Sequence, residues 1–142
     1  MENVAQSIKI LSELIEKKAN SELAAHNITL GQSRILILLL KSPRQISLKE
    51  LEKLFNVSQA TMHGTICRME KKGYLCTVYM SGDKKTKYAV LTDYGRELAE
   101  KLYRIIGDTN SWIVQSLTEA EQKEFMRMID KIHNSVNSGF TA

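Results

Sequence analysis

The side chains that could do chemistry lie between residues 58 and 87, and they are cationic and hydrogen-bonding groups. Lys84, Lys85 and Lys87 follow a Ser-Gly-Asp sequence, so three cations are gathered on one loop. Gln59 and Arg68 precede them, and amide and guanidinium groups pair with base edges while lysine pairs with phosphates. No nucleophile–base–acid set accompanies them, and neither a phosphate-binding glycine loop nor an HExxH zinc motif occurs in the sequence. These residue types favour binding of a polyanion over catalysis.

Two short helices would position the first of these groups. Ser47 and Glu50 have the spacing of a capping box, which predicts a helix from there to about Asn56. Ser58 caps the next helix, which ends at Lys71-Lys72-Gly73, where cations near the negative end precede a residue free to adopt positive φ. The apolar face of the first helix comprises Leu48, Leu51, Leu54 and Phe55, and that of the second comprises Met62, Ile66 and Met69.

A hairpin would position the lysines. Residues 75–80 and 87–91 are rich in β-branched and aromatic side chains, and the polar sequence from Ser81 to Thr86 lies between them. Asp83 is predicted to hold the turn by hydrogen bonds to its own backbone. Helix, turn, helix and a basic hairpin define a winged helix-turn-helix, so we expect a mainly α (α+β) fold.

The wing and the second helix resemble the MarR (multiple antibiotic resistance regulator) family of bacterial transcription regulators. Asp83, Leu91, Thr92 and Gly95 match the family's wing pattern, and Lys85 stands where the family usually has arginine. The segment from Leu51 to Gly73 is similar to the family's helix-turn-helix. The resemblance covers nearly the whole chain, and the wing is its most specific part.

The resemblance implies a regulator that binds double-stranded DNA. The second helix would enter a major groove with its first turn on base edges, and the wing would lie at a minor groove. Lysine in place of arginine at the wing predicts weaker sequence preference there, because an ammonium is a more strongly hydrated point charge. The predicted DNA-binding residues are Ser58, Gln59, Ala60, Thr61, His63, Gly64, Arg68 and Lys71 on the helix, and Lys84, Lys85 and Lys87 at the hairpin.

The middle of the outward face of this second helix is small, since it consists of Ala60, Gly64 and Cys67. Glycine within a helix costs about 1 kcal/mol relative to alanine. One interpretation is close approach of the helix backbone to the floor of the groove, with specificity carried by DNA shape. The other is simple tolerance of glycine at an exposed site, and we favour it.

The helical flanks are predicted to form a dimer. Residues 1–27 read as one amphipathic helix, with Val4, Ile8, Leu11 and Leu14 on its apolar side. A buried helix from Leu30 to Lys41 follows, with a capping box at Thr29, and Gln45-Ile46 is a candidate third strand. A long helix begins after Thr92, is weakened at Gly107 and runs to about Leu117. A last helix begins at Thr118 and ends at Ser138-Gly139, with its apolar face at Phe125, Met128, Ile129, Ile132 and Val136.

In the MarR family, the first helix and the last two helices form the dimer interface. The resemblance therefore implies a homodimer, with residues 1–28 and 97–142 as the dimerisation region and residues 29–96 as the DNA-binding region of one continuous domain. Many family members also bind small aromatic or phenolic effectors between the two regions. The candidate lining residues are His26, Arg34, Tyr94 and Tyr103.

Charge and composition agree with this interpretation. The chain carries 20 Lys and Arg against 16 Asp and Glu, but residues 41–96 hold 11 of the cations and 5 of the acids. The basic charge thus lies on the predicted DNA-binding region, as a polyanion-binding centre requires. The sequence lacks an apolar stretch long enough for a membrane span and an N-terminal secretion signal, so we expect a cytoplasmic protein associated with the bacterial nucleoid.

Two alternatives stay open on the same fold. One is a protein-interaction module, which would show an apolar patch where this sequence has lysine and arginine. The other is a thiol redox switch, which requires Cys67 or Cys76 to react at neutral pH. His63 and Cys67 are spaced as two metal ligands on one helix, but a zinc site needs about four, so we expect neither a metal nor a cofactor.

Overall fold

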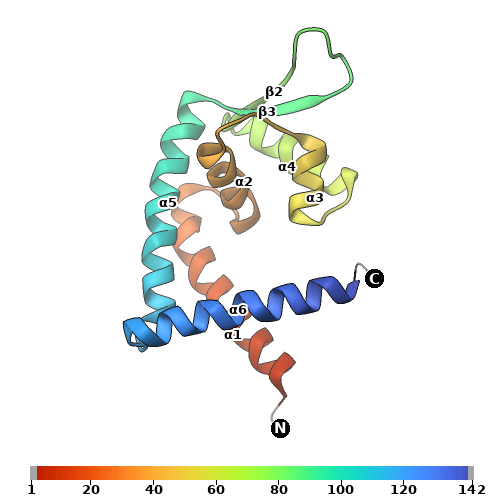
Figure 1. The fold of residues 1–142 in the computed structure, drawn as a ribbon. Helices are drawn as coiled ribbons and strands as arrows, with labels where there is room; N and C mark the ends of the chain where they lie inside the picture. Colours follow the sequence, from red (N-terminus) through yellow and green to blue (C-terminus); the bar gives the residue numbers. More distant parts are fainter. Residues whose placement is uncertain (1–2, 141–142) are drawn as a thin grey trace. The chain divides into compact units, whose positions relative to one another are not determined.

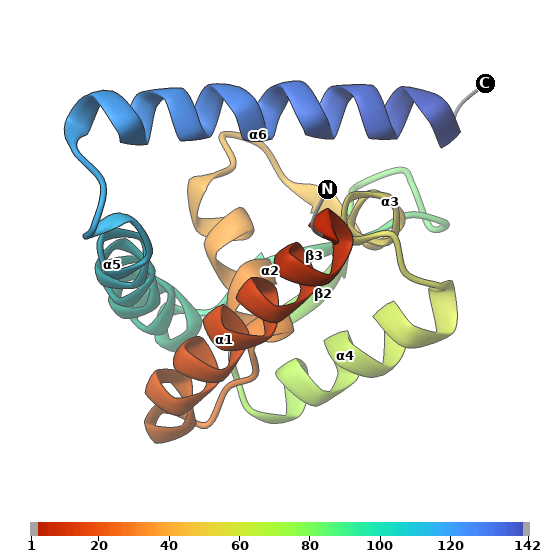
Figure 2. The same cartoon turned by 90° about the horizontal axis from the view of Figure 1, so that it is seen from below.

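The computed structural model describes residues 3–140, which divide at Gly107 into two compact units. Figures 1 and 2 show the ribbon, in which helices dominate and a small sheet lies beside α2, α3 and α4. The helices are α1 Val4–Leu23, α2 Leu30–Lys41, α3 Leu48–Phe55, α4 Gln59–Lys71, α5 Asp93–Val114 and α6 Glu119–Phe140, and the strands are β1 Ile46–Ser47, β2 Leu75–Tyr79 and β3 Lys87–Leu91. The mainly α, winged-helix class predicted from the sequence is confirmed.

The first predicted helix is shorter than expected. Residues 1 and 2 lie outside the described residues, and α1 ends at Leu23 rather than at Asn27. A 3-10 turn over Ala24–His26 follows, and Asn27 then adopts the left-handed conformation with φ 53°. Asparagine tolerates this conformation better than most residues. The chain therefore turns sharply into α2.

The first unit is built around α2, as its apolar sequence predicted. Thr29 and Gln32 form the expected capping box, with N–H to side-chain oxygen distances of 3.2 and 3.4 Å. The end of α1 and the first turns of α5 contribute to the same core. The fully buried members of that core include Leu23, Leu36, Leu51, Ile66, Met69, Tyr74, Leu75 and Leu102.

The helix-turn-helix forms where it was predicted. Ser47 and Glu50 make a reciprocal capping box, and α3 ends at Asn56 in the left-handed conformation with φ 50°. Figure 2 shows α3 nearly end-on while α4 lies across the view. One residue of the predicted apolar face was misplaced: Leu54 is 61% exposed. A helix of two turns has only a narrow buried stripe, and Leu51 occupies its centre.

The sheet has the order β1-β3-β2, with both pairs antiparallel. Ala89 of β3 pairs with Thr77 on one side and with Ile46 on the other. The third strand therefore exists, but it is Ile46–Ser47 rather than Gln45–Ile46, and β2 ends at Tyr79, one residue earlier than expected. In Figure 1 the β2–β3 loop extends beyond α3 and α4.

Helix α5 runs without a break through Gly107 to Val114, three residues short of the predicted end. No helix within residues 3–140 is by itself long and apolar enough to cross a membrane, and only Val4–His26 together with Leu30–Lys41, bent by 76°, pass that test as a pair.

The second unit contains α6. Thr118 and Glu121 form a capping box, with distances of 2.9 and 3.2 Å between N–H and side-chain oxygen. The predicted end at Ser138-Gly139 is wrong, because α6 continues to Phe140. Its apolar stripe is open to solvent in the single chain, since Met128, Ile129, Ile132 and Val136 are all exposed and Phe125 is half-buried.

Candidate nucleic-acid interface

Helix α4 presents its predicted outer face to solvent. Met62, Ile66 and Met69 are buried on the inner side. The hydroxyl of Ser58 accepts a hydrogen bond from the backbone N–H of Thr61 at 3.1 Å, which fixes the first turn. Among the predicted DNA-binding residues of this helix, the exposed ones are Gln59, Ala60, Thr61, His63, Arg68 and Lys71, and Gly64 is half-buried.

Gly64, in the middle of this face, is covered by the side chain of Arg68. A Cβ built on Gly64 would lie 3.3 Å from a terminal nitrogen of Arg68, and it would meet no backbone atom outside its own turn of helix. The same guanidinium donates to the hydroxyl of Thr65 at 3.3 Å. Because the end of an arginine side chain moves easily, packing in the free protein does not require glycine here.

The hairpin, which we call the wing (residues 75–91), has the turn that Asp83 was predicted to hold. Its carboxylate accepts from the backbone N–H groups of Lys85 at 2.9 Å and Thr86 at 3.2 Å. These hydrogen bonds, that from Lys85 above all, hold the pKa of Asp83 below its ordinary value, so the turn is formed at neutral pH. Gly82 takes φ 85° in the same turn. Lys84 and Lys85 are exposed, and Lys87 is half-buried.

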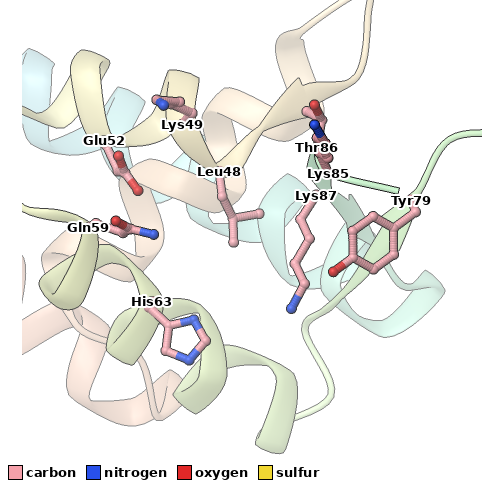
Figure 3. Close-up of a pocket in the computed structure, with 9 residues that line it drawn as sticks. All are labelled: Leu48, Lys49, Glu52, Gln59, His63, Tyr79, Lys85, Thr86 and Lys87. Carbon is pink, nitrogen blue, oxygen red and sulfur yellow. The ribbon is translucent and has the colours of Figure 1, made fainter. Parts of the chain in front are cut away.

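A concave surface lies between α3, the start of α4 and the wing, and it encloses a volume of about 570 Å³. Figure 3 shows Gln59 and His63 pointing into it from α4, with Lys87 and Tyr79 on the wing side. The Lys87 ammonium lies 5.7 Å from the centre of the Tyr79 ring. We call this surface the reading groove. Its lining residues are Leu48, Lys49, Glu52, Gln59, His63, Tyr79, Lys85, Thr86 and Lys87.

The reading groove unites the two predicted elements, and it adds residues that the sequence analysis missed. Gln59, His63, Lys85 and Lys87 were predicted, whereas Lys49, Glu52, Tyr79 and Thr86 were not. A signal for Lys49 was present, since at 100° per residue it lies almost opposite the buried Leu51 on α3. The lysines of this surface therefore come from α3 as well as from the wing, and α4 contributes the amide of Gln59 and the imidazole of His63.

The four candidate effector residues do not line this groove, nor a second hollow along α1. The Tyr94 ring packs against that of Tyr74 at 5.6 Å, and the Lys41 ammonium lies 3.7 Å over the Tyr103 ring. Arg34 is exposed on α2, and His26 is half-buried in the turn after α1. Each residue has a structural setting of its own, so the effector site stays a prediction.

The cysteines are both free, with Cys67 half-buried on α4 and Cys76 exposed on β2. The Cys67 sulfur lies 3.5 Å from Nε2 of His63, which is the contact that their spacing predicted. Within residues 3–140 no cluster of three or more His, Cys, Asp or Glu side chains is placed to hold a metal ion.

A helix-turn-helix with an exposed second helix and a cationic wing defines a winged-helix protein of the transcription-regulator class. The sequence model of the MarR family matches residues 26–78. Together with the fold, this match confirms the resemblance to the MarR family. The matched family model and the fold are those of transcription regulators.

Individual relatives agree with this assignment. The HTH-type transcriptional repressor Rv2887 of Mycobacterium tuberculosis is 24% identical over 119 residues, which cover 84% of this chain and 85% of the relative. A MarR family regulator from Listeria monocytogenes, solved with a 26mer DNA, has a TM-score of 0.86 at 20% identity and covers 99% of this chain and 93% of its own. MepR of S. aureus, solved with DNA, has a TM-score of 0.88 at 20% identity, with coverage of 95% and 99%. At this identity the two solved structures establish a shared fold.

Proposed function

We propose that this chain binds operator DNA as a homodimer and represses transcription in the bacterial cytoplasm. The observation that carries the proposal is the reading groove, where α3, α4 and the wing bring Lys49, Lys85 and Lys87 around the amide of Gln59 and the imidazole of His63. Ammonium groups neutralise phosphates, and amide and imidazole groups pair with base edges. Each subunit would place α4 in a major groove and the wing at a minor groove.

Exposed apolar surface on each unit supports the proposed dimerisation. On α1 the stripe starts in the core at Leu23 and Ala19 but continues outward through Leu14, Leu11 and Ile8, all of which are exposed. On α6 the stripe is exposed at Met128, Ile129, Ile132 and Val136, and it is half-buried at Phe125. Contiguous apolar surface of this kind marks an interaction site. A two-fold dimer would bind a pseudo-palindromic site, and a small aromatic effector would change the separation of its two DNA-binding regions.

A protein-interaction module is the competing function. Such a module would be expected to recognise its partner through an apolar patch on α4 and the wing. The reading groove instead gathers lysines from α3 and the wing, so its chemistry suits a polyanion.

The experiment that tests the proposal is selection of DNA from a random-sequence duplex pool by the full-length protein. We expect a two-fold symmetric site with half-sites about one helical turn apart. Steep salt dependence without an enriched site would contradict operator recognition and leave a non-specific DNA-binding protein. No binding even at low salt would contradict the DNA-binding function and favour the protein-interaction module.

The wing gives a second prediction. Replacing Lys84 and Lys85 with alanine should weaken binding to every duplex, because a lysine–phosphate contact is independent of sequence. The slope of log K against log salt should fall by about 1 for each lost phosphate contact. Alanine at Lys101 and Lys123, which are exposed outside the groove, removes the same charge and should leave the slope unchanged. A wing variant with the wild-type slope would remove the wing from the interface.

A further inference from the structure

Lys72 is the C-cap residue of α4, and its ammonium forms hydrogen bonds within the protein. It follows Lys71, which is exposed, and precedes Gly73 with φ 79°. Nζ of Lys72 donates to the backbone carbonyl of Asn27 at 3.0 Å and to Oε1 of Gln32 at 3.2 Å. The partners lie 45 and 40 residues away in the sequence. Two neighbouring lysines at the end of one helix therefore have different surroundings.

Both acceptors of Lys72 are held rigidly. Gln32 is 4% exposed, and its Oε1 also accepts from the Thr29 N–H in the capping box of α2. The carbonyl of Asn27 is directed by the left-handed backbone there, and it also accepts from the hydroxyl of Tyr74 at 2.8 Å. Tyr74 is 1% exposed, and its ring centre lies 5.8 Å from the same ammonium. We call residues 27–32 the α1–α2 corner.

The end of α4 is thus fixed to the α1–α2 corner by directional bonds. The rest of its inner side is held by Met62, Ile66 and Met69, whose apolar contacts have no preferred direction. Apolar contacts alone allow a helix to rotate or slide slightly, whereas hydrogen bonds to a charged group are short and oriented. Lys72 therefore adds an oriented contact with the α1–α2 corner to the hydrogen bond that the Thr77 hydroxyl donates to Glu70 at 3.2 Å.

We propose that Lys72 is a positioning residue for operator recognition, which sets the angle of α4 against the α1–α2 corner without touching DNA. The inference rests on the proposed function. Its consequence is that Lys72 determines the half-site spacing that a dimer accepts, because a change in the angle of each recognition helix changes the distance between the two.

The test compares Lys72→Met with Lys71→Met, which remove the same charge from adjacent positions. Methionine keeps most of the aliphatic stem in each. On random duplex, where no operator is needed, Lys71→Met should lower the salt slope by about 1 for each contact, and Lys72→Met should keep the wild-type slope. On selected sites rebuilt with different spacers, Lys72→Met should bind the optimal spacing about 10-fold more weakly and accept neighbouring spacings more equally. Lys71→Met should keep the wild-type spacing profile.

A second variant separates positioning from loss of folding. Tyr74→Phe removes only the hydroxyl that donates, like Lys72, to the carbonyl of Asn27. At temperatures well below unfolding, this variant should also accept a broader range of half-site spacings than the wild type, as Lys72→Met does. A Lys72→Met protein with a reduced salt slope would make Lys72 a phosphate contact and overturn the inference. Wild-type slope and wild-type spacing profile together would overturn it as well. Failure of the wild-type protein to select a symmetric site would instead contradict the proposed function, and the slope comparison would still decide whether Lys72 contacts phosphate.

Discussion

Replacing Gly95 with alanine is expected to lower the free energy of unfolding by about 3 kcal/mol, at the upper end of overpacking effects in well-packed regions. A Cβ at this position would lie 1.7 Å from the carbonyl oxygen of Tyr74 and 2.7 Å from its carbonyl carbon. Both obstacles are backbone atoms, so no side-chain rotation can relieve the clash. The first turn of α5 or the chain around Tyr74 would have to move.

The surrounding hydrogen bonds explain why neither segment moves freely. The hydroxyl of Thr92 donates to the carbonyl of Gly73 at 2.6 Å, and the N–H of Thr92 donates to the carbonyl of Tyr74 at 3.2 Å. The N–H of Gly95 donates in turn to the Thr92 hydroxyl at 3.0 Å. The Thr92 and Gly95 positions that match the MarR wing pattern therefore join the start of α5 to the residues just after α4.

Chemical denaturation with Gly107→Ala as the control would measure this effect. Gly107 lies in the same helix, and a Cβ there would meet nothing within 4 Å. Alanine at Gly107 should therefore raise the free energy of unfolding by about 0.5–1 kcal/mol, the ordinary gain within a helix. If Gly95→Ala were as stable as the wild type, the close contact between α5 and Tyr74 would not exist in solution.

Local signals explain why so much of the fold was predictable. Each capping box links residues three apart, so Thr29, Ser47 and Thr118 mark their helices without knowledge of the rest of the chain. The turn at Asp83 is equally local, since its carboxylate bonds to Lys85 and Thr86. Errors arose where no such signal exists: a glycine in the last turn of α6 does not fix the residue at which the helix ends, and helix ends vary by one or two residues.

The interface was only partly predictable, because its remaining members depend on contacts between distant segments. Periodicity placed Gln59 and His63 on the outer face of α4, but it could not show that Lys49 of α3 and Tyr79 of β2 border the same groove. The sequence also cannot show that Lys71 and Lys72 have different surroundings, since the partners of Lys72 come from the α1–α2 corner. Lys72 directly follows Lys71 of the predicted DNA-binding face, but its ammonium is bonded within the protein.

Glutamate at both Ile8 and Leu11 is expected to raise the dissociation constant of the proposed dimer at least about 100-fold, which corresponds to about 2.8 kcal/mol. The two side chains are 55% and 47% exposed in the single chain, so the substitutions do not disturb its core. In a dimer they would place two carboxylates per subunit in an apolar interface, and burying an unpaired charge is unfavourable. Sedimentation equilibrium would measure the change.

The control is glutamate at Gln6 and Asn20, which adds the same charge on the side of α1 away from the stripe. Both positions are exposed, and at 100° per residue they lie roughly opposite Ile8 and Leu11. This control should remain dimeric. Circular dichroism of both variants should show wild-type helix content, because glutamate is a good helix former.

Point substitutions distinguish the interface from the core better than deletion of α1 does. Leu23 is 1% exposed, so removing the helix would open the first unit and abolish binding for reasons unrelated to dimerisation. If the Ile8 and Leu11 variant is monomeric and loses the selected site while keeping weak binding to random duplex, then α1 supplies the interface and each subunit retains its own reading groove. If it stays dimeric at micromolar concentration, the apolar face of α1 is not the interface, and the exposed stripe of α6 becomes the surface that must hold the two subunits together.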